Sequence, residues 1–204
     1  MKITKIETQI RRQGRYSVFI DGKFAFGLSE LGLIDSGLRL GQELGEAEVH
    51  KLKNQAEIDK AYNLALGMLA RRPRSKWEMR EYLRRKGYDQ PIIEEILNKL
   101  SVKGFIDDED FARRWVESRR MLKPISKRKL HMELRQKRLS DEVINKTLAN
   151  DEADEAEVLR SEITRKRRQS RYRDDQKLIA YLARQGYRYS DIKEALQKED
   201  ETVG

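Results

Sequence analysis

The chain has 204 residues, of which 38% are hydrophobic and 39% are charged, and its formal net charge at pH 7 is +9. Globular domains are typically about 45–50% apolar and about 25% charged, so one large core is excluded and several small cores are favoured. The sequence contains no cysteine, which excludes disulfides and thiolate metal sites and indicates a reducing compartment, the cytoplasm. No apolar stretch predicts a signal peptide or a membrane span.

The first 58 residues are predicted to form a β-hairpin region with short helices. Aromatic and β-branched runs at Tyr16–Ile20 and Lys23–Phe26 flank Asp21-Gly22, which is the strongest short-range hairpin signal. Because an isolated hairpin is marginal in water, we expect it to pack against the helices that follow. A third strand is also expected, and its isoleucines are Ile3, Ile6 and Ile10.

Helices follow the hairpin region. Apolar residues punctuated by glycine predict one or two short helices over 29–45, and a longer helix is expected over 46–70, with a break near Gln55 or Asp59. From residue 61 onward the apolar residues recur at helical spacing, and Pro73 marks an end.

One short segment then occurs three times. It reads LRRKGY at Leu83–Tyr88, LRQKRL at Leu134–Leu139 and LARQGY at Leu182–Tyr187, at intervals of 51 and 48 residues. Self-similarity at such a period is the mark of a repeat architecture. The sequence therefore predicts a mainly α protein of tandem three-helix repeats in an elongated curved array, with repeats at 59–106, 107–150 and 151–204.

Helix-capping residues recur in the same register as the buried positions. Ser75 and Ser126 are expected to open the second helix of their repeats, and Gly87 and Gly186 to end it in the left-handed conformation. Arg138 stands where the other two copies have glycine, so a left-handed turn there would carry a modest strain. The acidic runs at helix starts are interpreted as caps.

The positive charges gather in three stretches. Residues 71–86 contain eight basic and two acidic residues, residues 113–138 contain eleven and two, and six of the nine residues at 165–173 are basic. Such clusters predict a polyanion partner, although a solvated helix surface is the alternative. The candidate contacts to a filament or to phosphate, expected to project freely from loops and helix starts, are Arg71, Arg72, Arg74, Arg119, Arg120, Lys127, Arg128, Lys129, Arg167, Arg168 and Arg171.

Aromatic and catalytic candidates were weighed beside these basic residues. Trp115 lies on the apolar track and is interpreted as core, whereas Trp77 stays open as a base-stacking candidate. His50 and His131 have no partners at metal-ligand spacing, and no glycine-rich phosphate loop or nucleophile–base pair is present. We therefore predict a non-enzymatic protein without a cofactor or a metal.

The junction between repeats resembles that of the RecX family. The residues that carry the resemblance are Gly104–Ala112 (GFIDDEDFA), Leu69–Ser75 (LARRPRS) and the Lys-Gly-Tyr and Gln-Gly-Tyr helix ends. RecX proteins are bacterial modulators of the RecA recombinase. The resemblance covers residues 60–200 well and the N-terminal region more loosely.

The resemblance implies a function that charge and spacing do not show. It implies tandem three-helix modules that lie in the groove of the RecA–DNA filament and mainly inhibit RecA ATPase, strand exchange and co-protease activity, restraining recombination and the SOS response. The expected partners are the RecA filament and single- and double-stranded DNA without sequence preference. The protein is expected to be a cytoplasmic monomer, nucleoid-associated when bound to the filament. The alternatives are a stand-alone helix-turn-helix-like DNA-binding protein and a pure protein-interaction scaffold.

Overall fold

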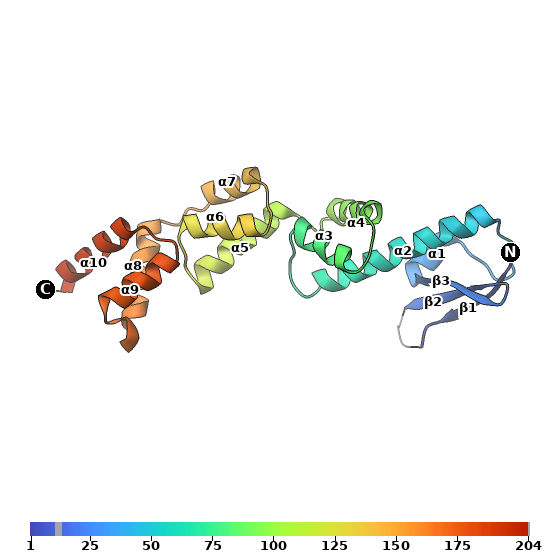
Figure 1. Cartoon of the computed structure of the whole chain (residues 1–204), viewed down its shortest axis with the longest axis horizontal. Helices are drawn as coiled ribbons and strands as arrows, with labels where there is room; N and C mark the ends of the chain where they lie inside the picture. Colours follow the sequence, from blue (N-terminus) through green and yellow to red (C-terminus); the bar gives the residue numbers. More distant parts are fainter. Residues whose placement is uncertain (11–13, 204) are drawn as a thin grey trace. The chain divides into compact units, whose positions relative to one another are not determined.

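The computed structural model describes residues 1–10 and 14–203, with no account of the side chains of residues 200–203 (Figure 1). The chain forms two compact units, Met1–Arg74 with Met79–Phe105, and Ser75–Glu78 with Ile106–Gly204. The described residues contain ten α-helices and one small antiparallel sheet. The predicted fold class, mainly α with an N-terminal β-hairpin region and three-helix repeats, is confirmed.

The sheet of the first unit has three strands in the order β1 (Ile3–Thr8), β2 (Arg15–Ile20) and β3 (Lys23–Ser29). Both pairs of neighbours are antiparallel. In the β2–β3 turn, Asp21-Gly22 adopts positive φ angles of 49° and 76°, the backbone of a type I′ turn, whose twist matches that of the strands. The hairpin and the third strand are confirmed, but Ile10 lies beyond β1 and is exposed.

Helix α1 (Glu30–Ser36) follows β3, and helix α2 (Glu46–Leu69) covers the sheet. The core between the sheet and α2 contains Ile3, Val18, Leu28, Val49 and Ala56. The expected break in α2 near Gln55 or Asp59 is wrong. Helix α2 contacts both β3 and α4 (Gln90–Val102), so one unbroken helix packs on the sheet and also forms the first helix of the first repeat.

The first repeat is completed by α3 (Lys76–Arg85) and α4. The first residues of α3 belong to the second unit. Asp89 caps α4 by accepting a hydrogen bond from the Ile92 backbone N–H at 3.2 Å, and Pro91 occupies the first turn, where its missing N–H costs nothing.

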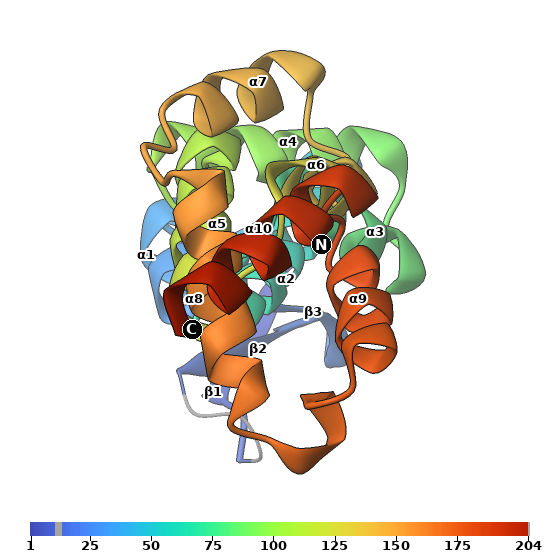
Figure 2. The same ribbon diagram turned by 90° about the vertical axis from the view of Figure 1, so that its left-hand side faces the viewer.

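The second unit contains two further three-helix groups. One comprises α5 (Asp108–Leu122), α6 (Lys127–Gln136) and α7 (Asp141–Ala149), packed around Leu130, Leu134 and Ile144. The other has its own core of Ile163, Leu178 and Leu182. Figure 2 brings this last group to the front; its elements are α8 (Glu155–Arg167), the 3-10 turn η1 (Ser170–Tyr172), α9 (Asp175–Arg184) and α10 (Tyr189–Val203).

The second helix of each repeat ends in the same way. Gly87, Arg138 and Gly186 have φ angles of 86°, 58° and 91°, so the predicted left-handed ends are confirmed, including the one at arginine. In each copy the backbone N–H of the next residue reaches back to the carbonyl five residues earlier, which satisfies an otherwise orphaned helix carbonyl. Within the described part of the chain, no helix has the length and apolar character needed to cross a membrane.

Candidate polyanion-binding surface

The predicted contact residues divide between the two units. Arg71 and Arg72 are exposed and Arg74 is half-buried, and all three follow α2 in the first unit. The remaining residues belong to the second unit, on the last turn of α5, the first turn of α6 and the segment from the end of α8 to η1.

Three further cationic side chains lie close enough to Lys129 for their charges to act on it, and we call Arg119, Lys123, Lys129 and Arg184 the Lys129 cluster. The Lys129 ammonium donates to the Arg184 backbone carbonyl and, at 3.3 Å, to Gln185 Oε1. Burial lowers the pKa of Lys129; the Glu133 carboxylate opposes this, and the charges of the other three cluster members lower the pKa further. Like charges that lie close together repel one another, so an anion bound among them lowers their electrostatic energy.

Trp115 lies beside this cluster, close to two cations and to the Phe111 ring, which stacks on it with ring centres 5.9 Å apart. The Arg119 guanidinium and the Lys137 ammonium each lie 4.8 Å from the centre of its ring. Its indole N–H donates to Glu133 Oε2 at 2.8 Å, and Arg119 Nε donates to the same oxygen at 2.8 Å. Trp115 packs against the core of α5–α7, as expected, but it is only half-buried.

Contacts continue from Trp115 to the start of α3. Lys137 Nζ lies 2.8 Å from Glu78 Oε1, and the guanidinium of the exposed Arg138 lies 6.0 Å from the Trp77 ring centre. Cation–aromatic contacts of this kind contribute about 0.5–1 kcal/mol at exposed sites. Cationic and aromatic side chains therefore form one connected series from α9 to the start of α3, all within the second unit.

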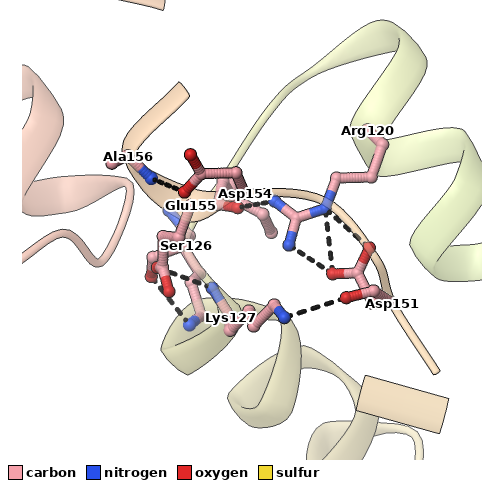
Figure 3. Close-up of polar contacts among 9 residues, drawn as sticks. Arg120, Ser126, Lys127, Asp151, Asp154, Glu155 and Ala156 are labelled. Atoms are coloured by element: carbon pink, nitrogen blue, oxygen red, sulfur yellow. Dashed lines mark hydrogen bonds and ion pairs between the residues drawn. The ribbon is translucent and has the colours of Figure 1, made fainter. Parts of the chain in front are cut away.

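Arg120 and Lys127 do not project freely, contrary to expectation, because both hold together the two three-helix groups of the second unit (Figure 3). The Arg120 guanidinium faces the Asp151 carboxylate at 2.5 Å and donates to the Ile125 carbonyl at 2.7 Å. Side-chain exposures of 13% for Arg120 and 7% for Asp151 make this a largely buried ion pair. Lys127 donates from Nζ to the Asp151 carbonyl at 2.9 Å.

The same junction includes the start of α6. The Lys127 backbone N–H donates to Glu155 Oε1 at 3.0 Å, and the Ser126 N–H donates to the Gln185 carbonyl at 3.1 Å. Ser126 is 1% exposed, and its hydroxyl caps α6 by accepting from the Lys129 N–H. The cap residue of one repeat is thus also a contact with the end of the second helix in the next repeat.

Equivalent contacts occur one repeat earlier, where Ser75–Glu78 meet α5 and α6. The Lys76 backbone N–H donates to Asp108 Oδ1 at 2.8 Å, and the Ser75 hydroxyl donates to the Lys137 carbonyl at 3.1 Å. Ser75 is fully buried, as Ser126 is nearly. The second unit therefore contains two junctions built from the same positions of the repeat. The residue after the serine donates its N–H to a carboxylate in both, whereas the serine donates from its hydroxyl in one and from its backbone N–H in the other.

The third basic stretch is also partly used within the fold. Arg167 pairs with Asp175 at 2.6 Å and Glu199 at 3.3 Å and donates to backbone carbonyls, so it does not project freely. Arg168 and Arg171 are exposed, and the Arg171 guanidinium lies 5.9 Å from the Tyr172 ring centre. Arg128 is likewise exposed on the first turn of α6.

Sequence reasoning missed four residues of this surface, Lys123, Lys137, Arg138 and Arg184. A signal for Lys123 was present, because Trp115, Arg119 and Lys123 recur every four residues and so share one face of α5. No comparable signal marks Arg184, which reaches Lys129 only through the packing of one repeat on the next.

The fold and this surface define a basic protein of tandem three-helix repeats behind a small N-terminal sheet. Three family descriptions match the chain: the Regulatory protein RecX N-terminal domain at residues 1–45, the first three-helix domain of RecX at 61–100 and the second at 107–148. The chain belongs to the RecX family.

Relatives and solved structures agree with this assignment. The chain is similar to the regulatory protein RecX of Bacillus licheniformis, at 30% identity over 97% of this chain and 77% of that protein. It is 36% identical to that of Halalkalibacterium halodurans over 72% of this chain, but this match spans only 56% of the relative. A crystal structure of regulatory protein RecX superposes with a TM-score of 0.71 at 28% identity, covering 96% of this chain and 98% of that one. RecX from Lactobacillus salivarius shares the fold, with a TM-score of 0.60 at 23% identity over 71% of this chain and 97% of that one.

Proposed function

We propose that this chain regulates the RecA recombinase by binding the RecA–DNA filament in its groove, mainly inhibiting RecA ATPase, strand exchange and co-protease activity. Membership of the RecX family supports RecA as the partner. The observation that supports contact with the filament's DNA is the Lys129 cluster beside the half-buried Trp115. The protein would act as a cytoplasmic monomer without a cofactor, and would restrain recombination and the SOS response.

The chemistry of the Lys129 cluster favours phosphate as its ligand. Lys123 and Arg184 are exposed cations, and phosphate contacts release counterions without reading the base sequence. Trp115 is not counted as a base-stacking face, because Arg119 and Lys137 lie over its ring and Phe111 stacks on it. Phosphate contacts by exposed cations fit binding to single- and double-stranded DNA without sequence preference.

Helix-turn-helix readout is a weaker alternative for this chain. The third helix of the α5–α7 group would be the recognition helix, yet α7 begins with Asp141 and Glu142. Recognition helices contact base edges through the residues of their N-terminal turns. Two carboxylates at that end repel the phosphates on either side of the groove, which disfavours insertion of α7.

The experiment is a titration of RecA ATPase on single-stranded DNA with the wild-type chain and two variants. The double variant Lys123→Glu with Arg184→Glu reverses two exposed charges of the cluster. The control is Arg114→Glu, a single charge reversal on the far side of α5 at a residue whose ion pair with Asp110 is exposed.

We expect wild-type and control to inhibit alike, and the double variant to need a much higher concentration. Each lost phosphate contact also lowers the salt slope of single-strand binding by about 0.7. Equal inhibition by all three proteins would show that the Lys129 cluster does not contact the filament. Absence of inhibition by the wild-type chain would contradict the proposed function itself.

A further inference from the structure

The first repeat carries the groups that the other two repeats use at their junctions. By position in the repeat, Glu57 corresponds to Asp108 and Glu155, and Lys86 corresponds to Lys137 and Gln185. In the second unit, these carboxylates and the backbone carbonyls of Lys137 and Gln185 accept hydrogen bonds from the helix start of the preceding repeat.

In the first unit, none of the described residues covers the equivalent surface in this way. A Cβ atom added at Gly186 would lie 2.4 Å from Ser126 Oγ, whereas one added at Gly87 would meet no atom of a described residue within 4 Å. Tyr187 is 5% exposed beneath its junction, whereas Tyr88 at the same position is half-buried. Glu57 is exposed.

A pocket of about 450 Å³ lies over this end of α3. The Arg15 guanidinium in its wall is already engaged, because it donates to the Gly27 carbonyl at 3.2 Å and lies 3.7 Å from Asp59. Lys60 and Lys86 are exposed, so their ammonium groups are accessible to a ligand. The other lining residues are Asn63, Leu64 and Tyr88.

We propose that this pocket, which we call the Lys86 socket, binds the first turn of a helix in a partner protein. That helix begins with Ser or Thr and has Glu or Asp three residues later. The hydroxyl donates to the Lys86 carbonyl, the next backbone N–H donates to the Glu57 carboxylate, and the acid pairs with the Lys86 ammonium. This is the arrangement of Ser75, Lys76 and Glu78 at the first junction of the chain.

The Lys86 carbonyl and the nearby Glu57 carboxylate favour a helix start over a free anion. Glu57 does not line the pocket, but its charge acts on Tyr88, which does, and this carboxylate would repel a phosphate group bound there. A helix N-terminus presents unsatisfied N–H groups and a partial positive charge to these acceptors, and its acidic side chain to the lysine. The proposal concerns the first unit and does not depend on phosphate binding by the Lys129 cluster.

The test is an NMR titration of the ¹⁵N-labelled full chain with a synthetic helical peptide, N-acetyl SAAEAAARAAAA, bridged between side chains because short free helices are marginal. The control peptide, AAAKAAARAAAA, lacks the hydroxyl and reverses the acid. We expect the first peptide alone to shift the amide signals of Glu57, Lys86, Gly87 and Tyr88 in a saturable manner.

Two variants make the test specific. Lys86→Glu should weaken binding of the peptide about tenfold or more, as loss of a charge-assisted contact implies. Arg85→Glu, the same charge change on the neighbouring exposed residue, should leave it unchanged. The proposal is overturned if both peptides bind equally, if Lys86→Glu has no effect, if no shift occurs at millimolar peptide, or if inorganic phosphate produces the same shifts more effectively.

Discussion

Replacing Gly186 by alanine tests the close packing between the last two repeats. The added Cβ would lie 2.4 Å from Ser126 Oγ and 2.7 Å from Lys129 Cβ, and the backbone would stay at a φ of +91°. A left-handed non-glycine residue costs about 1–2 kcal/mol, and overpacking adds about 1–3 kcal/mol. We therefore expect the Gly186→Ala change to lower the free energy of unfolding of the second unit by about 2–5 kcal/mol.

The matched control is Gly87→Ala, at the same position of the first repeat. Its φ is +86° and its Cβ would meet no atom within 4 Å in the part of the chain that the structure describes, so only the conformational cost of about 1–2 kcal/mol applies. Urea unfolding is followed by tryptophan fluorescence, which reports the second unit because Trp77 and Trp115 both belong to it, and by far-ultraviolet circular dichroism, which reports the helices of both units. A Gly186→Ala cost no larger than that of Gly87→Ala would refute the close approach.

Three further changes test other contacts. Asp151→Ala leaves the largely buried Arg120 without its carboxylate, and urea unfolding should show a loss of about 3–5 kcal/mol; a loss below about 1 kcal/mol would contradict a buried pair. Arg138→Gly removes the strain of a left-handed arginine, about 1–2 kcal/mol, and loses a cation–aromatic contact of about 0.5–1 kcal/mol, so calorimetry should show a net gain of about 0–1.5 kcal/mol; destabilisation would oppose the strain argument. Burial raises the pKa of Tyr181, assisted by its hydrogen bond to Glu162, and burial also raises the pKa of Tyr187. The unfolded chain ionises these tyrosines near the ordinary value of 10, so stability should fall as pH rises above 10. An ultraviolet titration in which all eight tyrosines ionise near pH 10 with the fold intact would contradict their burial.

Local signals in the sequence were sufficient for most of the fold. The repeated segments at Leu83–Tyr88, Leu134–Leu139 and Leu182–Tyr187 specify helix ends, because the leucine is buried and the left-handed residue that follows stops the helix. Asp21-Gly22 specifies a hairpin through its positive φ angles. These features depend on neighbours in the chain, so they can be found without the tertiary structure. The break expected in α2 failed because packing at both ends of that helix outweighs a weak local signal.

The candidate site was only partly accessible to the same reasoning. Composition and the four-residue spacing from Trp115 to Lys123 place positive charge on α5. They cannot show that Arg119 and Arg120 have different roles. Arg119 lies beside Trp115, whereas Arg120, the next residue of the helix, forms an ion pair with Asp151, 31 residues along the chain. An angle of about 100° between consecutive helix residues decides which of the two faces a neighbouring repeat.

The repeat pattern, the caps and the excess of positive charge follow from the order of residues alone, because each is set within a few positions along the chain. The tertiary structure alone decided which cations remain available and which are used at junctions. That choice depends on carboxylates and carbonyls brought together from distant positions, as when Glu155 and Gln185 meet the start of α6. The same long-range packing leaves Lys86 open where Lys137 and Gln185 are covered.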